Sequence, residues 1–273
     1  MLDLLIGTSG YDYPEWKGVF YPEDLKRKDF LSYYATQFNA LELNNTFYNM
    51  PTAERLLSFY ERSEGRLNFS VKANKLLTHE IGADWQVAAK NFKDALIPLN
   101  EKERLSAVLF QLPESFHYTD DNRIYLAKLI AEFEGLEKRK AGIVFCDMPQ
   151  LKNLPDGTVM KTPFIGSNAY IRLHGRNEGA WYAHAPKAQT SITSTHANRA
   201  KATYAAGESL NGSARYCYDY SENELAQFIL IIKQAKREGK KVQVYFNNHP
   251  NGSGAKNAIS LKKMIVMDKT GEK

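Results

Sequence analysis

Residues 41–48, Leu-Glu-Leu-Asn-Asn-Thr-Phe-Tyr, decide the fold of this chain. Successive side chains of a β-strand point to opposite faces, so Leu41 and Leu43 share one face while Glu42 and Asn44 share the other. A half-buried strand carries a carboxylate on its second face where that face is wet or functional. The segment therefore predicts a strand with an apolar face toward the core and a polar face toward a site.

The same alternation recurs in the strands predicted farther along the chain. Apolar residues fill one face of each strand, and polar residues gather on the other face near its carboxyl end. These polar positions are Lys72 in residues 67–73, Gln111 in 107–111, Asp147 after 142–146, Arg172 and His174 in 169–175, and Tyr245 and Asn247 in 242–247. Their recurrence predicts a shared polar site.

Helical patterns separate these strands, at about residues 29–38, 53–62, 85–99, 120–133 and 222–238. Strand and helix in alternation predict parallel strands joined by helical crossovers. The central strands of a doubly wound sheet are apolar on both faces, so the polar alternation favours a TIM-like (β/α) barrel, whose site lies at the carboxyl ends of the strands.

Length and composition bound the class of protein. A chain of 273 residues with 43% hydrophobic and 25% charged residues predicts one α/β domain over residues 1–273. The N-terminal run Met-Leu-Asp-Leu-Leu-Ile-Gly reads as a strand rather than a signal peptide, and no segment approaches the ~18 apolar residues of a membrane span. The absence of such a segment predicts no membrane partner. Only Cys146 and Cys217 are present, without metal-like spacing, which argues against a disulfide framework and predicts a reducing, cytoplasmic location.

The charge leaves one alternative partner open. The net charge is +5, with basic clusters at residues 26–28, 138–140, 236–237 and 240–241. Such runs are typical of solvated helix ends, but they also contact phosphate backbones, so nucleic acid is kept as an alternative partner. Residues 183–214 are rich in Ala, Ser, Thr, Asn and Gly, which predicts a long flexible loop.

Several blocks, spread over nearly the whole chain, carry a family resemblance. They are Gly7-Thr8-Ser9-Gly10, Trp16 with Phe20-Tyr21-Pro22, residues 42–51, Val71-Lys72-Ala73, Thr78-His79, Phe110-Gln111-Leu112-Pro113, Arg172-Leu173-His174-Gly175 and Tyr245-Phe246-Asn247-Asn248. In these blocks the chain resembles the DUF72 family, also called YecE-like. The resemblance implies a TIM-like barrel and brings no settled activity with it.

The chain departs from the family pattern in two places. The family usually has a further strand and helix between the Gln-Leu-Pro strand and the strand ending at Asp147. Here the predicted strands number seven, beginning at residues 4, 41, 67, 107, 142, 169 and 242. We therefore expect the barrel to lack one β/α unit between residues 134 and 141. The second departure is the long segment 183–214.

The polar strand ends supply a candidate site for a small polar or anionic ligand. Glu42, His174, Lys72 and Asp147 are the candidate catalytic residues. The candidate substrate-binding residues are Thr8, Asn44, His79, Gln111, Arg172, Tyr245, Asn247 and Asn248. Arg172 and Lys72 suit a phosphate or carboxylate, and Glu42 and His174 suit general acid–base chemistry.

Structural roles compete with these assignments. Lys72 and Glu42 would also make a buried ion pair, and His174 would also bind a loop carbonyl. Glu42, His79, Asp147 and His174 are suitable metal ligands, but no compact metal motif is present, so a divalent metal is left open and not favoured.

The leading hypothesis is an enzyme acting by acid–base chemistry on a small phosphorylated or sugar-like substrate, with hydrolase, lyase and isomerase chemistry all open. The alternatives are a nucleic-acid-binding or endonuclease-like barrel and a non-catalytic protein that binds a small ligand.

Overall fold

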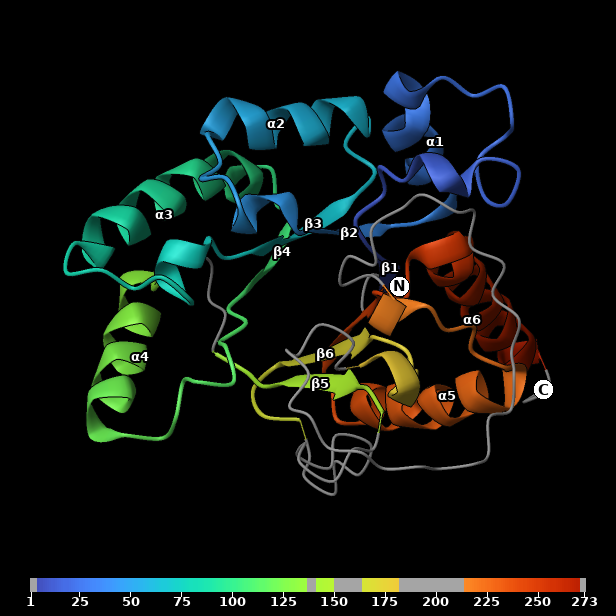
Figure 1. The fold of residues 1–273 in the computed structure, drawn as a ribbon. Helices are drawn as coiled ribbons and strands as arrows, with labels where there is room; N and C mark the ends of the chain where they lie inside the picture. The colour runs from blue at the N-terminus through green and yellow to red at the C-terminus, as the bar shows by residue number, and fades with distance from the viewer. Residues whose placement is uncertain (1–3, 137–140, 150–163, 182–213, 271–273) are drawn as a thin grey trace, which may run out of the picture.

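A computed structural model describes residues 4–136, 141–149, 164–181 and 214–270 (Figure 1). The predicted loop at 183–214 lies outside the described residues except for Ala214.

The described residues form one sheet of seven parallel strands, curled into a half-barrel (Figure 1). The strands are β1 (Leu4–Ser9), β2 (Ala40–Leu43), β3 (Asn68–Lys72), β4 (Leu105–Leu109), β5 (Val144–Asp147), β6 (Asn168–Leu173) and β7 (Lys241–Phe246). Their order is β4-β3-β2-β1-β7-β6-β5, and every neighbouring pair is parallel. This is the strand order of a barrel opened between β4 and β5, which confirms the predicted TIM-like fold and the missing unit near residues 134–141.

In the described residues a helix follows every strand except β5, and the helices lie on the outer side of the sheet. They are α1 (Phe30–Gln37), α2 (Ala53–Arg62), α3 (Trp85–Glu101), α4 (Asp120–Glu132), α5 (Glu222–Arg237) and α6 (Ser253–Thr270). Side chains at their N-termini fix where three of them begin: Thr52 and Thr119 accept from the backbone of α2 and α4, and Ser221 forms a capping box with Glu224. In Figure 1, α2 lies beside α3 and α5 beside α6, and both pairs are in contact.

The main core lies between the helices and the outward side chains of the strands. Leu41, Phe69, Val71, Ile171 and Val244 are each fully buried there. These are the apolar positions of the alternation, so the apolar face of each strand faces the helices, as the sequence predicts.

The strand β2 is shorter than the predicted segment 41–47. It ends at Leu43, and residues Asn45–Phe47 form a short 3-10 helix. Thr46 accounts for this turn, because its hydroxyl donates to the carbonyl oxygens of Leu43 and Lys72, at 3.1 and 2.6 Å.

Side chains inside the half-barrel connect strands that the backbone leaves unpaired. The hydroxyls of Ser70 on β3 and Tyr170 on β6 lie 2.5 Å apart, and those of Ser106 on β4 and Tyr245 on β7 lie 3.2 Å apart. The side-chain amide of Gln243 also donates to the carbonyl of Ser106, at 3.2 Å. These bonds join the two sides of the open sheet across its interior.

Within the described residues, no helix is long and apolar enough to cross a bilayer.

Candidate functional site

Glu42 lies at the centre of the polar interior and is fully buried. Its carboxylate accepts from the hydroxyls of Ser9 and Tyr170, both at 2.7 Å, and from Nη2 of Arg172 at 2.9 Å. Burial alone raises the pKa of Glu42, but Arg172 and the two hydroxyls bring that pKa below its usual value. Glu42 is therefore ionised, and its oxygen atoms are occupied by donors.

Arg172 is buried beside Glu42, with 3% of its side chain exposed. Besides the bond to Glu42, Nη1 donates to the side-chain carbonyl of Gln111 at 3.0 Å. Burial opposes the charge, but Glu42 raises the pKa of Arg172 above its usual value. Its Nε is buried and has no hydrogen-bond partner among the described residues.

Lys72, at the end of β3, is half-buried and stands above the ring of Phe47, with Nζ 4.5 Å from the ring centroid. Burial, helped by the charge of Arg172, lowers the pKa of Lys72 to about 8, against the opposing effect of Glu42. Within the described part of the chain, Nζ makes neither a hydrogen bond nor an ion pair. The ion pair between Lys72 and Glu42 considered from the sequence is not formed, because Arg172 takes that position.

His174 follows β6 and is 7% exposed. Its Nδ1 lies 2.8 Å from the side-chain nitrogen of Asn247, which donates, so the neutral ring carries its proton on Nε2. Burial, with the charges of Arg172 and Lys72, lowers the pKa of His174 well below its usual value. The rings of Tyr216 and Trp181 stand beside it, with centroids at 5.7 and 6.4 Å.

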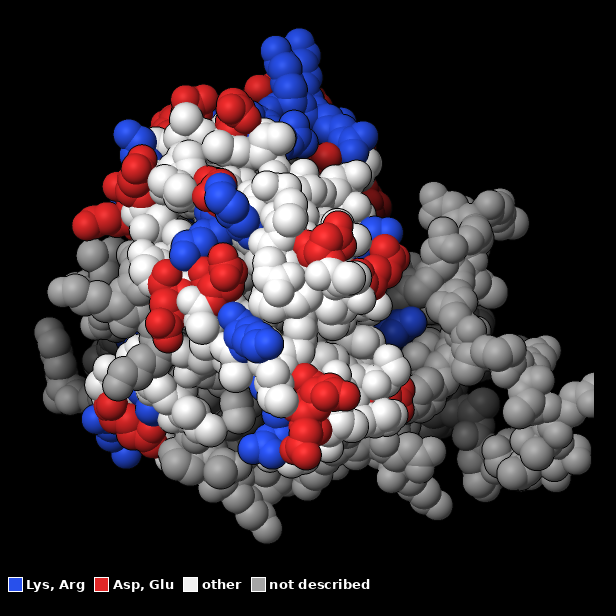
Figure 2. All heavy atoms as spheres, turned by 90° about the vertical axis from the view of Figure 1, so that its left-hand side faces the viewer, with Lys and Arg blue, Asp and Glu red and all other residues white. Residues whose placement is uncertain are grey.

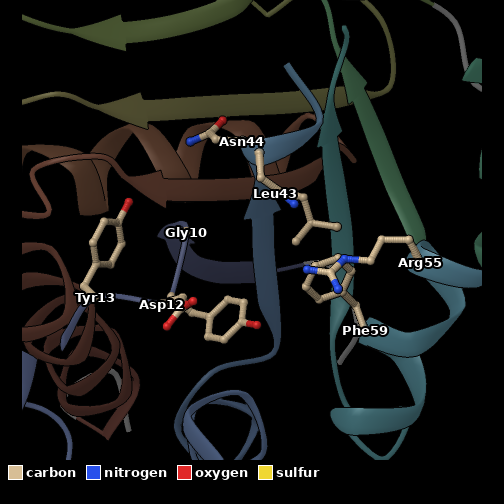
Figure 3. A pocket seen from close by; sticks show the side chains of 9 residues that line it. Gly10, Asp12, Tyr13, Leu43, Asn44, Arg55 and Phe59 are labelled. Carbon is tan, nitrogen blue, oxygen red and sulfur yellow. The ribbon is translucent and has the colours of Figure 1, made fainter. Parts of the chain in front are cut away.

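Two predicted residues lie at the rim of this group. His79 is exposed, packs edge-on against Phe47 at 4.9 Å, and has a pKa lowered by partial burial and by Lys72. Asn44, just after β2, lines a hollow of about 220 Å³ together with Tyr13, Arg55 and other residues. Figure 3 shows Asn44 at the end of its strand, with Tyr13 to one side and Arg55 to the other. The side-chain oxygen of Asn44 is buried and has no partner among the described residues.

Asp147 is not brought together with this group. Arg172 pairs in register with Cys146, so Cys146 faces the interior and Asp147 faces the helices. There the Asp147 carboxylate accepts from Nη2 of Arg176 at 2.8 Å and from the hydroxyl of Tyr220 at 2.7 Å. Which residues of this short strand face the interior decides where Asp147 lies, and a continuous apolar run does not reveal that.

Three predicted substrate-binding residues also lie apart from the group. Thr8 points outward and bonds to the hydroxyl of Tyr34 at 3.0 Å. The amide of Asn248 donates to Asn257 at 2.8 Å, on the side of α6. Tyr245 is buried deeper in the interior, where its ring packs at a tilt against that of Tyr170 and its hydroxyl lies within hydrogen-bond distance of that of Ser106.

A family model described as "Protein of unknown function DUF72" matches residues 5–136 and 131–272. The chain belongs to the DUF72 family. A DUF72 family protein of known structure from Thermotoga maritima is 30% identical, with a TM-score of 0.74 over 96% of this chain and 99% of that chain. One from Enterococcus faecalis is 21% identical and shows the same fold, with a TM-score of 0.71 over 96% of this chain and 95% of that one.

The sequence relative UPF0759 protein YunF of Bacillus subtilis (strain 168) is 23% identical, over 98% of this chain and 96% of the relative. The two stretches that match the DUF72 model overlap at residues 131–136. This junction lies directly before the opening between β4 and β5, so the break in the family match and the break in the sheet coincide.

The sequence reasoning missed Ser9 and Tyr170, two of the three residues that bind the Glu42 carboxylate in this DUF72 protein. Tyr170 shares the face of Arg172 and His174 in the alternation, so the pattern itself contained that signal. Ser9 stands in the block Gly7-Thr8-Ser9-Gly10, which was not read as part of the strand that begins at residue 4, whereas β1 continues to Ser9. Extending the alternation of Leu5 through Gly7 would have placed Ser9 inside.

The four potential metal ligands of the sequence do not converge. Glu42 and Asp147 lie on opposite faces of the sheet, each with its own arginine. In the described part of the chain, no three His, Cys, Asp or Glu side chains are grouped so that they could hold a metal ion.

Proposed function

We propose that this DUF72 protein is an enzyme that acts by acid–base chemistry on a small phosphorylated or sugar-like substrate at the carboxyl ends of its strands. The observation that supports this most is the surplus positive charge beside a neutral histidine. Arg172 is balanced by Glu42, while Lys72 has no acidic partner among the described residues.

The charge balance favours an anionic group on the substrate. A half-buried lysine next to a buried arginine is a destabilised cation, which the lowered pKa of Lys72 reflects. An anion bound beside Nζ relieves that repulsion and raises the pKa of Lys72 again. We therefore expect anion affinity to fall as the pH rises through about 8, where Lys72 loses its proton.

The other residues of the site have two kinds of role, transferring a proton and positioning other groups. His174 is the group for proton transfer, since it is neutral and its Nε2–H is fixed by the bond between Nδ1 and Asn247. Glu42 positions Arg172 rather than acting as a base, because three donors already occupy its oxygen atoms. The rings of Tyr216 and Trp181 offer apolar faces suited to a sugar.

The test combines ligand binding and turnover. Binding of inorganic phosphate and of a panel of sugar phosphates is measured by calorimetry, and conversion of the panel is followed by NMR. Lys72→Met should weaken binding at least about tenfold, because it removes a half-buried charge. His174→Gln should retain binding and lower turnover by about 10²-fold or more, the usual contribution of a general acid or base.

Lys90 provides the matched control, since it is exposed and paired with Asp94 on α3. Lys90→Met should bind phosphate like the wild type. Equal affinities of the wild type and Lys72→Met would show that the charge argument is wrong. Turnover that survives His174→Gln unchanged would remove the acid–base assignment.

The charge distribution does not favour the nucleic-acid alternative on the face shown in Figure 2. Over most of this face Lys and Arg are interspersed with Asp and Glu, and a group of Lys and Arg gathers at its upper edge. A nucleic-acid-binding face concentrates positive charge over a larger area.

A further inference from the structure

Lys72 differs from Arg172, the buried cation beside it, because the side-chain nitrogen of Lys72 has no hydrogen-bond partner among the described residues. Arg172 is committed to Glu42 and Gln111. The Nζ of Lys72 is neither fully buried nor paired by a hydrogen bond or ion pair within the described residues, and it lies over the ring of Phe47, 4.5 Å from the centroid. It also stands at the carboxyl end of a barrel strand, where reacting groups of this fold gather.

We propose that Lys72 is a nucleophile that forms an imine with a small aldehyde or ketone carrying an anionic group. This inference rests on the proposed function and narrows its substrate class from a small phosphorylated or sugar-like compound to an anionic carbonyl compound.

The surroundings of Lys72 explain why its amine reacts. A lysine is activated when it is desolvated or placed next to another cation, because both effects favour the uncharged amine. Both conditions hold here, since Lys72 is partly buried and feels the charge of Arg172. The carboxylate that would have kept the lysine protonated, Glu42, is bound by Arg172 instead. At a pKa of about 8 in the protein without ligand, a useful fraction of the amine is uncharged near neutral pH. The imine, once protonated, again places a positive charge beside the anionic group of the substrate.

The reaction needs no further reagent. The lone pair of Nζ attacks the carbonyl carbon, a C–N bond forms, and the π electrons of the carbonyl move to its oxygen. The two hydrogens of the amine leave with that oxygen as one water molecule while the C=N bond forms. His174 supports the step by donating a hydrogen bond from Nε2–H to the oxygen, a role that a neutral imidazole fills.

Reductive trapping tests the inference. The full-length protein is incubated with glycolaldehyde phosphate, dihydroxyacetone phosphate or pyruvate in the presence of sodium cyanoborohydride, and the adduct is located by intact mass and peptide mapping. We expect one fast label, on Lys72, with a rate that rises through about pH 8. Exposed lysines should label more slowly, because their amines are free only near pH ~10.4.

Two variants separate the outcomes. Lys72→Arg keeps the positive charge but cannot form an imine, so the fast label should vanish, whereas Lys90→Arg should label like the wild type. Saturating inorganic phosphate should slow the labelling of Lys72 and leave that of Lys90 unchanged. Unfolding curves confirm that each variant is folded.

The results also distinguish this inference from the proposed function. If Lys72 labels no faster than Lys90 with every probe, while Lys72→Met still weakens phosphate binding, the imine is wrong and the proposed function stands. If Lys72 labels fast but phosphate neither binds nor slows the labelling, the claim that the substrate carries an anionic group is overturned in both proposals.

Discussion

Two buried carboxylates of this protein have the same kinds of partner and opposite charge surroundings. Glu42, inside the half-barrel, binds Arg172, Tyr170 and Ser9. Asp147, on the helix side of the sheet, binds Arg176 and Tyr220. Both carboxylates are almost completely inaccessible, at 0% and 1% exposure.

The difference lies in what stands next to each arginine. Arg172 has Lys72 as a neighbour, so the inner group holds two cations and one carboxylate. Arg176 contacts Glu224 as well as Asp147, so the outer group holds one cation and two carboxylates. The inner group thus favours an added anion, whereas the outer group is internally satisfied and ties β5 to the start of α5.

The largest effect should come from Glu42→Ala. This change leaves Arg172 charged, buried and unpaired, which costs about 3–5 kcal/mol of unfolding free energy. Urea denaturation measures it. Glu61→Ala, at an exposed position of α2, serves as the control and should stay within about 0.5 kcal/mol of the wild type.

Asp147→Ala should cost less, about 1–3 kcal/mol, by the same measurement. Arg176 keeps its contact with Glu224, and 25% of its side chain is exposed to water. Equal losses for Asp147→Ala and Glu42→Ala would break the distinction between the two groups.

A third test uses the histidine of the inner group. The pKa of His174 is lowered in the folded protein, so the unfolded chain binds the proton first as the pH falls below ~6.5. The contribution of this histidine to the free energy of unfolding is therefore complete above that pH. It is lost as the pH falls, by up to about 1.4 kcal/mol per pH unit. Urea denaturation at pH 7, 6 and 5 should show a shallower loss in His174→Gln than in the wild type, and identical slopes would contradict the assignment.

The smallest effect should come from Ser106→Ala, which removes the neutral hydrogen bond between the hydroxyls of Ser106 and Tyr245 across the interior. The expected cost is about 1 kcal/mol of unfolding free energy. Ser115→Ala, at an exposed position, is the control and should leave stability unchanged. A loss as large as that of Asp147→Ala would show that the neutral hydrogen bonds across the interior contribute as much to stability as the buried ion pairs do.

The sequence predicts most of the architecture because alternation is a local property. Leu41, Leu43 and Glu42 fix the faces of β2 without knowledge of any partner. The missing β/α unit is also readable, since the chain between α4 and β5 is too short to hold it. The end of β2 was not predicted, because it depends on a bond from Thr46 to Lys72, a residue of the next strand.

The site is predicted less well because partner choice is not local. Lys72 and Arg172 were both expected near Glu42, and only the geometry across the interior decides that Arg172 binds it. Asp147 shows the second limit: in a short apolar strand, a shift of one residue moves a side chain to the other face, and Cys146 takes the interior position.

The opening between β4 and β5 has a mechanical consequence. In a closed barrel, backbone hydrogen bonds around the whole circumference fix the radius. Here the hydrogen-bonded pairs Ser70–Tyr170 and Ser106–Tyr245 connect opposite strands through the interior. The reach of two tyrosine side chains therefore sets the width of this half-barrel, and the space above them, where Lys72 and His174 lie, is held to the same width.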